Sequence, residues 1–392
     1  QQQVQPAQKP APKQVDRHAH PEKLLKGSRG ASDAEGGSPF IMSSEVSGLG
    51  ASYWKSPSFK HPVHGLAIGD VNGDGRIETV LISDHEVIIF GNTDGRFYKI
   101  AEIVGNKSIN LLSVDIADIN DNGTPEIFAT GLNATRNALN SYVLEFDGAN
   151  YAKIIESASW YFRVVESPAR GKVLLGQRHR RENAFAGPVE ELEWRGSEYV
   201  PRDHVRVPKP INVMGLAMGD IAGNREEYFV YFKDNDQLQI IDGSGKRVWA
   251  GSEKLGGGNL YYVVPKTDRG EVETKRYYPT PIQVHNMPGS PEPEIIVARN
   301  FEAANRKLEQ LRIYTGGQIE SYVWDGMGLA NKWRTRRLTG FIRDFAVGDF
   351  DNDGDDELII VLIQSTGEAM LTSAKSNLIA YDMVLPVAEK TE

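Results

Sequence analysis

The sequence contains no cysteine among its 392 residues. A disulfide scaffold and a thiolate metal site are therefore both excluded, although this absence does not discriminate between cellular compartments. No apolar run approaches the roughly 18 residues that a membrane-spanning helix needs. The chain starts at Gln1 without a signal-like apolar segment. We therefore expect a processed or truncated product of a longer precursor that follows the secretory route.

Positive charge is in the minority. The chain carries 44 Lys and Arg residues against 53 Asp and Glu residues, which gives a formal net charge of −9. This balance argues against nucleic acids and anionic membranes as partners. Much of the acidity lies in one short stretch, residues 349–357, where carboxylates repel one another unless a cation lies among them.

Recognisable catalytic motifs are also absent. The sequence has neither a Gly-x-Ser-x-Gly nucleophile elbow nor a phosphate-binding loop. Its scattered histidines do not come with the further ligands that a zinc site requires. The abundant carboxylate pairs belong to acidic loops rather than to an isolated acid and base. We therefore expect a protein that is not an enzyme.

What the chain has instead is one nine-residue acidic loop that occurs three times, each time before a short apolar, β-branched stretch. Oxygen-bearing side chains occupy positions 1, 3 and 5, glycine occupies position 6 and glutamate occupies position 9. These residues are Asp70, Asn72, Asp74, Gly75 and Glu78 in the first copy, Asp118, Asn120, Asn122, Gly123 and Glu126 in the second, and Asp349, Asp351, Asp353, Gly354 and Glu357 in the third.

This pattern is how a short loop wraps Ca²⁺. The ion takes six to eight oxygen ligands at about 2.3–2.6 Å, and alternate side chains of a curling loop can all face inward. Glycine at position 6 permits a turn that a residue with a Cβ resists. The residue at position 7 can then offer its carbonyl oxygen. The alternative is a set of acidic turns without metal, since Asp, Asn and Gly are ordinary turn residues. Three copies in one register favour calcium, with about three ions.

The EF-hand, which uses a similar loop, is excluded. It needs a glutamate at position 12 and a helix on each side. Position 12 is Leu81, Ala129 or Ile360 here, and the flanking residues form short, β-branched, strand-like runs. Each loop therefore joins two strands.

The repeated unit is longer than the loop. After the second strand, the pattern predicts a third strand, a turn of the Asp-Gly type and a fourth strand. A fourth copy starts at Asp220 with alanine at position 3 and arginine at position 6. We expect its loop to be one residue short and to bind no metal. Two further units without the acidic pattern are predicted around the loops 166–171 and 286–294.

Six four-stranded units predict an all-β fold, a β-propeller. The last unit lacks a fourth strand, and a lone strand near residues 53–59 would complete it and close the ring. Six blades are favoured, and seven stay open because residues 256–280 hold further strand-like material. We expect the propeller to span residues 38–388, after a disordered tail or linker over residues 1–37 that is rich in Pro, Gln and Gly.

At these residues the sequence resembles the FG-GAP/VCBS repeat family, which includes the integrin α-chain propeller and many bacterial secreted proteins. The matching stretches are residues 63–82, 113–129 and 345–363, with a decayed match at 214–231. The resemblance implies Ca²⁺ in the loops between the first and second strand of a blade. The implied ligands are Asp70, Asn72, Asp74, the carbonyl of Arg76 and Glu78; Asp118, Asn120, Asn122, the carbonyl of Thr124 and Glu126; and Asp349, Asp351, Asp353, the carbonyl of Asp355 and Glu357. Clear Phe-Gly…Gly-Ala-Pro signatures are lacking, so an integrin-like ligand is not implied.

We therefore expect a non-enzymatic, calcium-stabilised β-propeller outside the cytoplasm, whether secreted, periplasmic or at the cell surface. It would serve as a binding or scaffold module for a protein or glycan partner, within a larger surface or envelope assembly. Two other functions stay open. One is an extracellular enzyme that acts on polysaccharide, a lyase or a hydrolase. The other is a purely structural subunit of a cell-surface assembly.

Overall fold

The computed structural model describes residues 28–30, 40–42, 53–59, 61–93, 95–135, 138–180, 184–185, 187–264, 274–287, 290, 292–302, 312–364 and 375–383. Of the expected tail, residues 1–37, only Ser28–Gly30 are described, and the end of the expected propeller, residues 384–388, also lies outside. The described residues form strands and loops, with one short 3-10 helix, η2 (Val213–Gly215). No helix within these ranges is long and apolar enough to cross a membrane.

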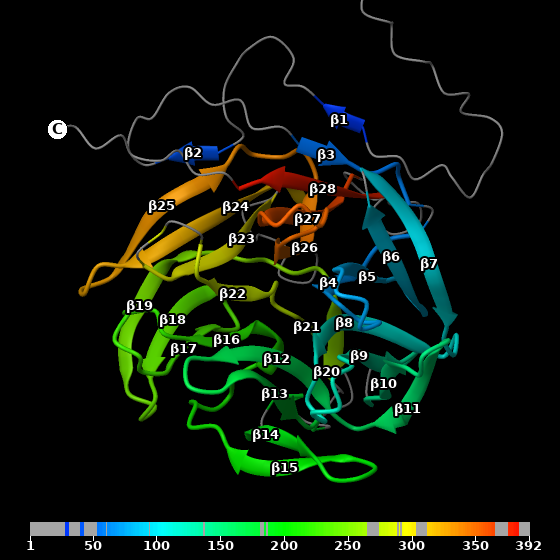
Figure 1. Cartoon of the computed structure of the whole chain (residues 1–392). Helices are drawn as coiled ribbons and strands as arrows, with labels where there is room; N and C mark the ends of the chain where they lie inside the picture. The colour runs from blue at the N-terminus through cyan, green and yellow to red at the C-terminus, as the bar shows by residue number, and fades with distance from the viewer. Residues whose placement is uncertain are drawn as a thin grey trace, which may run out of the picture.

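Six antiparallel blades stand in a ring around a central axis (Figure 1). Blade 1 consists of β4 (Gly65–Gly69), β5 (Glu78–Ile82), β6 (Glu86–Thr93) and β7 (Arg96–Val104); blade 2 of β8 (Ile109–Ala117), β9 (Glu126–Asn133), β10 (Ser141–Phe146) and β11 (Tyr151–Ala158); and blade 3 of β12 (Tyr161–Ser167), β13 (Gly171–Gln177), β14 (Val189–Trp194) and β15 (Tyr199–His204). Blade 4 consists of β16 (Leu216–Gly219), β17 (Tyr228–Phe232), β18 (Gln237–Asp242) and β19 (Arg247–Lys254); blade 5 of β22 (Ile282–His285), β23 (Glu294–Glu302), β24 (Tyr314–Trp324) and β25 (Leu329–Thr335); and blade 6 of β26 (Phe341–Gly348), β27 (Glu357–Ile363), β28 (Ser376–Asp382) and β3 (Tyr53–Lys55). The predicted all-β, six-bladed propeller is confirmed.

Blade 6 is built from both ends of the chain. Its outer strand β3 pairs with β28, in the register Tyr53 with Tyr381 and Trp54 with Ala380. The predicted closure by an N-terminal strand is therefore confirmed, and it joins the two ends of the ring by strand hydrogen bonds. Two more short strands extend the outer edges of the last two blades. β1 (Ser28–Gly30) pairs with β3, and β2 (Phe40–Met42) pairs with β25.

The strand-like material that left seven blades open forms a separate hairpin. β20 (Tyr261–Val264) pairs with β21 (Thr274–Tyr277) in a two-stranded sheet between blades 4 and 5. The two strands pair only with each other in the described structure, and no first or fourth strand accompanies them. The hairpin is therefore an insertion rather than a seventh blade.

The core lies between neighbouring blades. The second strands are buried along their whole length in β5 and β27, which explains their continuous apolar sequence. Val80 and Ile89 of blade 1 pack with Val114 and Ile116 of blade 2 in one buried cluster. The outer strand β7 is mostly exposed instead. These blades thus bury both faces of the second strand and meet solvent at the outer strand, so the layer of second strands is closely packed.

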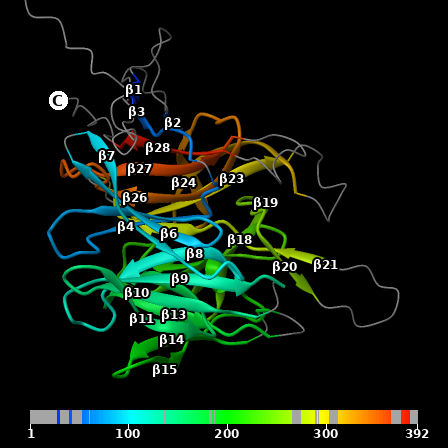
Figure 2. The ribbon, with the colours of Figure 1, turned by 90° about the vertical axis from the view of Figure 1, so that its right-hand side faces the viewer.

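The turn between the first and second strand of each blade lies on the same side of the ring. We call this side the loop face; it carries residues 70–77, 118–125, 220–227 and 349–356. The β20–β21 hairpin belongs to a connection between blades and projects from the opposite side (Figure 2).

Candidate metal centres

The three predicted calcium loops lie on three consecutive blades. They connect the first and second strands of blades 1, 2 and 6, and blade 6 adjoins blade 1 because the ring closes there. Asp344 of blade 6 accepts a hydrogen bond from the backbone N–H of Leu66 in blade 1 at 2.8 Å, which ties these blades together. Loops from opposite ends of the sequence therefore share one sector of the loop face.

The aspartate at position 1 organises the curl of each loop. The two carboxylate oxygens of Asp118 accept hydrogen bonds from the N–H groups of Asn122 and Gly123, at 3.1 and 2.9 Å. Asp70 and Asp349 accept from the same two loop positions, 5 and 6, at 2.9–3.2 Å. The backbone thus wraps around one carboxylate in all three copies.

Two positions in each loop adopt left-handed backbone conformations. Position 6 has φ of +83° at Gly75, +89° at Gly123 and +97° at Gly354, and position 4 has φ of +74° at Gly73, +57° at Asp121 and +62° at Asn352. A Cβ added at the three glycines of position 6 would meet no atom within 4 Å, so the requirement is conformational rather than steric. The requirement at position 4 is met by Gly, Asp and Asn, which tolerate this region best.

Side chains at positions 3 and 5 fold back over the loop. Asn72 accepts a hydrogen bond from the N–H of Asp74 at 2.9 Å, and the side-chain oxygen at position 5 accepts one from the N–H at position 7 in every copy. The N–H groups at position 7 belong to Arg76, Thr124 and Asp355, at 2.9, 2.8 and 3.0 Å. These are Asx-type turns, which hold the side-chain oxygens over the inside of the curl.

The third loop brings three carboxylates together. Oxygen atoms of Asp349, Asp351 and Asp353 all lie within 4.8 Å of one another. At this separation ionised carboxylates repel one another strongly unless a cation neutralises them. A donor set made only of oxygen atoms fits a hard cation such as Ca²⁺. The residues present therefore fit the ion that the sequence predicts.

The glutamates at position 9 lie behind the loops. Glu78, Glu126 and Glu357 begin β5, β9 and β27, and at most 3% of each residue is exposed. Each accepts a hydrogen bond from the backbone N–H at position 2, at 2.7–3.0 Å. Glu357 stands outside the three-carboxylate cluster of its loop.

Burial raises the pKa of these glutamates. The pKa is raised to about 7 for Glu78 and Glu126 and to about 8 for Glu357, with the aspartates of the same loops adding to the effect. Among the ion pairs of the described residues, none joins these three glutamates to a lysine or arginine. A cation in the loop would favour their ionised form.

Blade 5 supplies an internal comparison. Glu294 begins β23 opposite His285, so it stands at position 9 of a loop that lacks the aspartates. It is fully buried; its Oε1 lies 2.8 Å from Nζ of Lys332, and its Oε2 accepts a hydrogen bond from Nε1 of Trp333 at 2.7 Å. In blade 5, the glutamate at position 9 is thus neutralised by a lysine. Sequence reasoning missed this position, although its place at the start of the second strand could have revealed it.

The loop of blade 4 corrects one prediction. Gly219 pairs with Tyr228 just as Gly69 pairs with Glu78, so the loop has the same length as the others and is not one residue short. The two strands fix this register, and Tyr228 stands where the other loops have glutamate. Asp220 still organises the curl, because its carboxylate accepts a hydrogen bond from the N–H of Arg225 at 2.7 Å. Arg225 takes the left-handed conformation, with φ of +65°.

A comparison with known protein families identifies the repeat in one part of the chain. Residues 70–129, which span the first two loops, match the model of the FG-GAP-like repeat. No curated protein matches the chain. Solved structures resemble it only distantly. The BBS1N chain of a complex with ARL6DN, soaked with mercury, is 13% identical with a TM-score of 0.46 and covers 89% of this chain and 99% of its own. The SapL1 lectin in complex with alpha methyl fucoside is 12% identical with a TM-score of 0.43, and the match covers 76% of this chain and 88% of the lectin chain. The exotype rhamnogalacturonan lyase YesX is 12% identical with a TM-score of 0.35, and the match covers 92% of this chain and 76% of the lyase chain.

The resemblance inferred from the acidic loops is therefore confirmed where the repeat model matches, over the first two loops and the strands between them. The third loop shares their length, their strand register and their pattern of hydrogen bonds. The chain is a six-bladed β-propeller that carries an FG-GAP-like repeat at residues 70–129.

Proposed function

We propose that this protein is a calcium-stabilised β-propeller that acts outside the cytoplasm as a non-enzymatic binding or scaffold module. The observation that carries the proposal is the recurrence of one loop geometry on three consecutive blades of the loop face. In blades 1, 2 and 6 the same positions hold the same backbone curl, and a glutamate without a lysine or arginine partner among the described ion pairs lies behind each loop.

The residues that would hold the ions are those at positions 1, 3, 5, 7 and 9 of the three loops. They are Asp70, Asn72, Asp74, Arg76 and Glu78; Asp118, Asn120, Asn122, Thr124 and Glu126; and Asp349, Asp351, Asp353, Asp355 and Glu357. Position 7 would contribute its carbonyl, and the side chain of Arg76 is turned aside toward Thr93, 3.4 Å away. Ca²⁺ would neutralise the carboxylates and lock the curl. Since such an ion binds the folded chain, it would raise the free energy of unfolding.

A calcium-dependent fold suits a compartment rich in calcium. Cytosolic Ca²⁺ is kept too low to fill simple structural sites, whereas secreted, periplasmic and cell-surface proteins meet higher concentrations. We therefore place the protein outside the cytoplasm. There the loop face would present a rigid surface to a protein or glycan partner, because the loops stand on strands that are buried between blades.

The experiment that separates binding from catalysis uses the purified chain in Ca²⁺ and in EDTA. It is offered a panel of polysaccharides, and both retention of the protein and release of products are measured. Retention in Ca²⁺ without unsaturated or newly reducing products supports a binding module. Product release would contradict the proposal in favour of a lyase or hydrolase. A variant that combines Asp349→Asn with Asp353→Asn serves as the control for dependence on the third loop.

A further inference from the structure

The glutamates at position 9 differ in what completes their carboxylates. In blade 1, Oε1 of Glu78 accepts a hydrogen bond from the side-chain amide of Asn72 at 3.2 Å. In blade 2, Oε1 of Glu126 accepts hydrogen bonds from the hydroxyl of Tyr199 and from the N–H of Asn120, the latter at 3.2 Å. In blade 5 a lysine takes the same place, as described above. Since Oε2 of each glutamate also has a donor, these three carboxylates are complete.

The carboxylate of Glu357 in blade 6 is incomplete. Its Oε2 accepts the N–H of Phe350 at 2.8 Å, whereas its Oε1 has no hydrogen bond or ion pair within the described part of the chain. Only 3% of the residue is exposed. Buried polar atoms are nearly always paired, and an unpaired charged group costs more than a neutral one. The free oxygen therefore requires a partner that the described residues do not supply.

The residue at position 3 explains the difference. Asn72 gives its side-chain amide to Glu78, and Asn120 gives its amide to Glu145 on the third strand of blade 2, at 2.6 Å. The third loop has Asp351 at this position, and an aspartate side chain has no N–H to donate when it is ionised. Blade 6 thus has an additional carboxylate where blades 1 and 2 have a donor.

The free oxygen of Glu357 opens onto a cavity of about 690 Å³, which Asp351, Asp353 and Asp382 also line. The oxygen is not sealed off, because the buried side-chain atoms without a partner in the described structure do not include it. Besides burial, the charges of these three aspartates raise the pKa of Glu357, so all of them act on the same carboxylate. Arg76 lines the cavity too, but its guanidinium is turned toward a threonine and forms no ion pair with them among the described residues. The missing partner is therefore a cation.

The three loops also differ in charge. Positions 1, 3, 5 and 9 hold three carboxylates in the first loop, two in the second and four in the third. The affinity of a loop for Ca²⁺ rises with the number of charged ligands. In addition, Glu78 and Glu126 have to give up the donors on Oε1 before that oxygen can face an ion, whereas Glu357 gives up none. Both comparisons rank the third loop first, and the charge count ranks the second loop last.

We propose that the loops fill with Ca²⁺ in a fixed order, the third loop first and the second loop last, and that Asp351 sets the affinity of the first site. This order rests on the proposed calcium function. It assigns two roles to one kind of loop: the third holds a permanent ion, and the second responds to changes in calcium.

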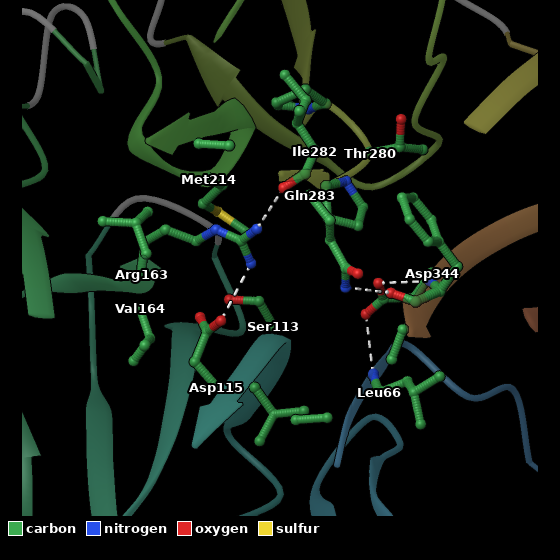
Figure 3. A pocket seen from close by; sticks show the side chains of 18 of the residues that line it. Leu66, Ser113, Asp115, Arg163, Val164, Met214, Thr280, Ile282, Gln283 and Asp344 are labelled. Carbon is green, nitrogen blue, oxygen red and sulfur yellow. Dashed lines mark hydrogen bonds and ion pairs between the residues drawn. The ribbon is translucent and has the colours of Figure 1, made fainter. Parts of the chain in front are cut away.

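The third loop lies where the ring closes. At the axis, Asp344 of blade 6 lines a central cavity of about 260 Å³ and accepts the N–H of Leu66 of blade 1 at 2.8 Å (Figure 3). At the loop face, Asn352 of the third loop accepts the N–H of Ile77 of the first loop at 2.7 Å. An ion bound most tightly at this place keeps the ends of the ring joined at calcium concentrations that leave the second loop empty.

The test is titration calorimetry of the full, metal-stripped chain with Ca²⁺. Asp351→Asn gives the third loop the side chain of the other two and should weaken the tightest step about tenfold. Asn122→Asp keeps an acceptor for the N–H of Thr124 and adds a carboxylate at position 5, so it should tighten the weakest step about tenfold. Asp121→Asn is the matched control, because it removes a charge from the second loop outside the ligating positions. It should change each step far less.

A titration with Tb³⁺, with luminescence excited through tryptophan, assigns the steps to the loops. Trp54 lines the cavity beside the third loop, and the ring of Trp194 lies 4.9 Å from that of Tyr199, which contacts Glu126 of the second loop. Trp54→Phe should remove the luminescence of the first ion, and Trp194→Phe should remove that of the last. Unfolding curves check that both variants are folded.

Two kinds of result would overturn the order. If the three loops bind Ca²⁺ with equal affinity, if Asp351→Asn leaves the tightest step unchanged, or if the first Tb³⁺ signal survives in Trp54→Phe, the order is wrong while the calcium function stands. If the chain binds no Ca²⁺ at all, the order and the proposed function both fail.

Discussion

The side-chain amide of Asn352 pairs with both backbone groups of Ile77, as one strand pairs with another. Its Oδ1 accepts the N–H of Ile77 at 2.7 Å, and its Nδ2 donates to the carbonyl oxygen of Ile77 at 3.2 Å and to that of Asn92 at 3.1 Å. Asn352 belongs to the acidic loop of blade 6, and Ile77 belongs to the acidic loop of blade 1. The contact therefore fastens the junction where the ring closes, at the loop face.

Replacing Asn352 by glycine should weaken this junction. Glycine keeps the left-handed backbone of position 4, where φ is +62°, so the change removes the three hydrogen bonds without adding strain. We expect the free energy of unfolding to fall by about 1–3 kcal/mol, as measured by denaturant unfolding.

Asp121 provides the control, since it occupies position 4 of the second loop with φ of +57° and is exposed. Asp121→Gly should change the stability by less than about 1 kcal/mol. Equal effects of the two substitutions would show that the contact between Asn352 and Ile77 does not stabilise the ring.

The conformation of position 6 predicts substitutions of opposite sign. Gly75→Ala, at φ of +83°, should destabilise the protein by about 1–2 kcal/mol because only the backbone conformation opposes it. Arg225→Gly, at φ of +65° in the loop of blade 4, should instead stabilise by up to about 1 kcal/mol. Both are measured by denaturant unfolding in EDTA, so that metal does not contribute. A destabilising effect of Arg225→Gly would contradict the account of this position.

The lysine that neutralises the glutamate of blade 5 should be needed for stability. Lys332→Met leaves Glu294 fully buried without its cation and should cost about 2–4 kcal/mol. The double variant Glu294→Gln with Lys332→Met should recover part of the loss, because the buried charge is then removed as well. Thermal and denaturant unfolding of the two variants measure the difference. If the double variant is no more stable than Lys332→Met, the unpaired charge of Glu294 is not the cause of the lost stability.

Burial in the central cavity predicts a pH dependence. Burial raises the pKa of Asp344 from 3.8 to about 7, partly offset by the N–H groups of Leu66 and Phe345 and by Arg163, while Asp115 opposes ionisation. The folded chain therefore holds this proton more tightly than the unfolded chain. Its contribution to stability is full below about pH 3.8 and is lost as the pH rises through about 7.

The variant Asp344→Asn isolates this effect, because asparagine has no carboxyl group to titrate. The stability of the wild type minus that of the variant should fall by roughly 2–4 kcal/mol between pH 4 and pH 8, at about 1.4 kcal/mol for each unit of pKa shift. Denaturant unfolding at several pH values measures it. A difference that stays constant, or that rises with pH, would show that the carboxyl group is ionised as readily in the folded chain as in the unfolded one.

The sequence predicted the elements that follow from a repeated local pattern. Turn residues and strand-like runs locate the units. The missing fourth strand of the last unit points to the lone strand near residues 53–59, of which Tyr53–Lys55 pair with β28 in the structure. The prediction that the loop at Asp220 is one residue short is wrong, because the pairing of Gly219 with Tyr228 sets its length. Register is a property of two strands and is only weakly visible in one.

Contacts between blades could not be predicted in the same way. Nothing near Asn352 in the sequence indicates Ile77, and nothing near Arg163 indicates Ile282, because these contacts join residues that only the closed ring brings together. The short strands β1 and β2 were missed for a related reason. They pair with edges that other segments provide, and their own sequences carry little periodicity.

The most direct test of the account is thermal unfolding of the purified chain in excess EDTA and again after Ca²⁺ is titrated back, with Mg²⁺ as control and elemental analysis of each sample. The account predicts a rise in melting temperature that is specific to Ca²⁺ and reaches its plateau with about three ions for each chain. Asp349→Asn combined with Asp353→Asn should remove one ion and part of that rise. The central claim would be contradicted by a melting temperature that does not change with Ca²⁺ together with an elemental analysis that finds no metal. The three loops would then be acidic turns.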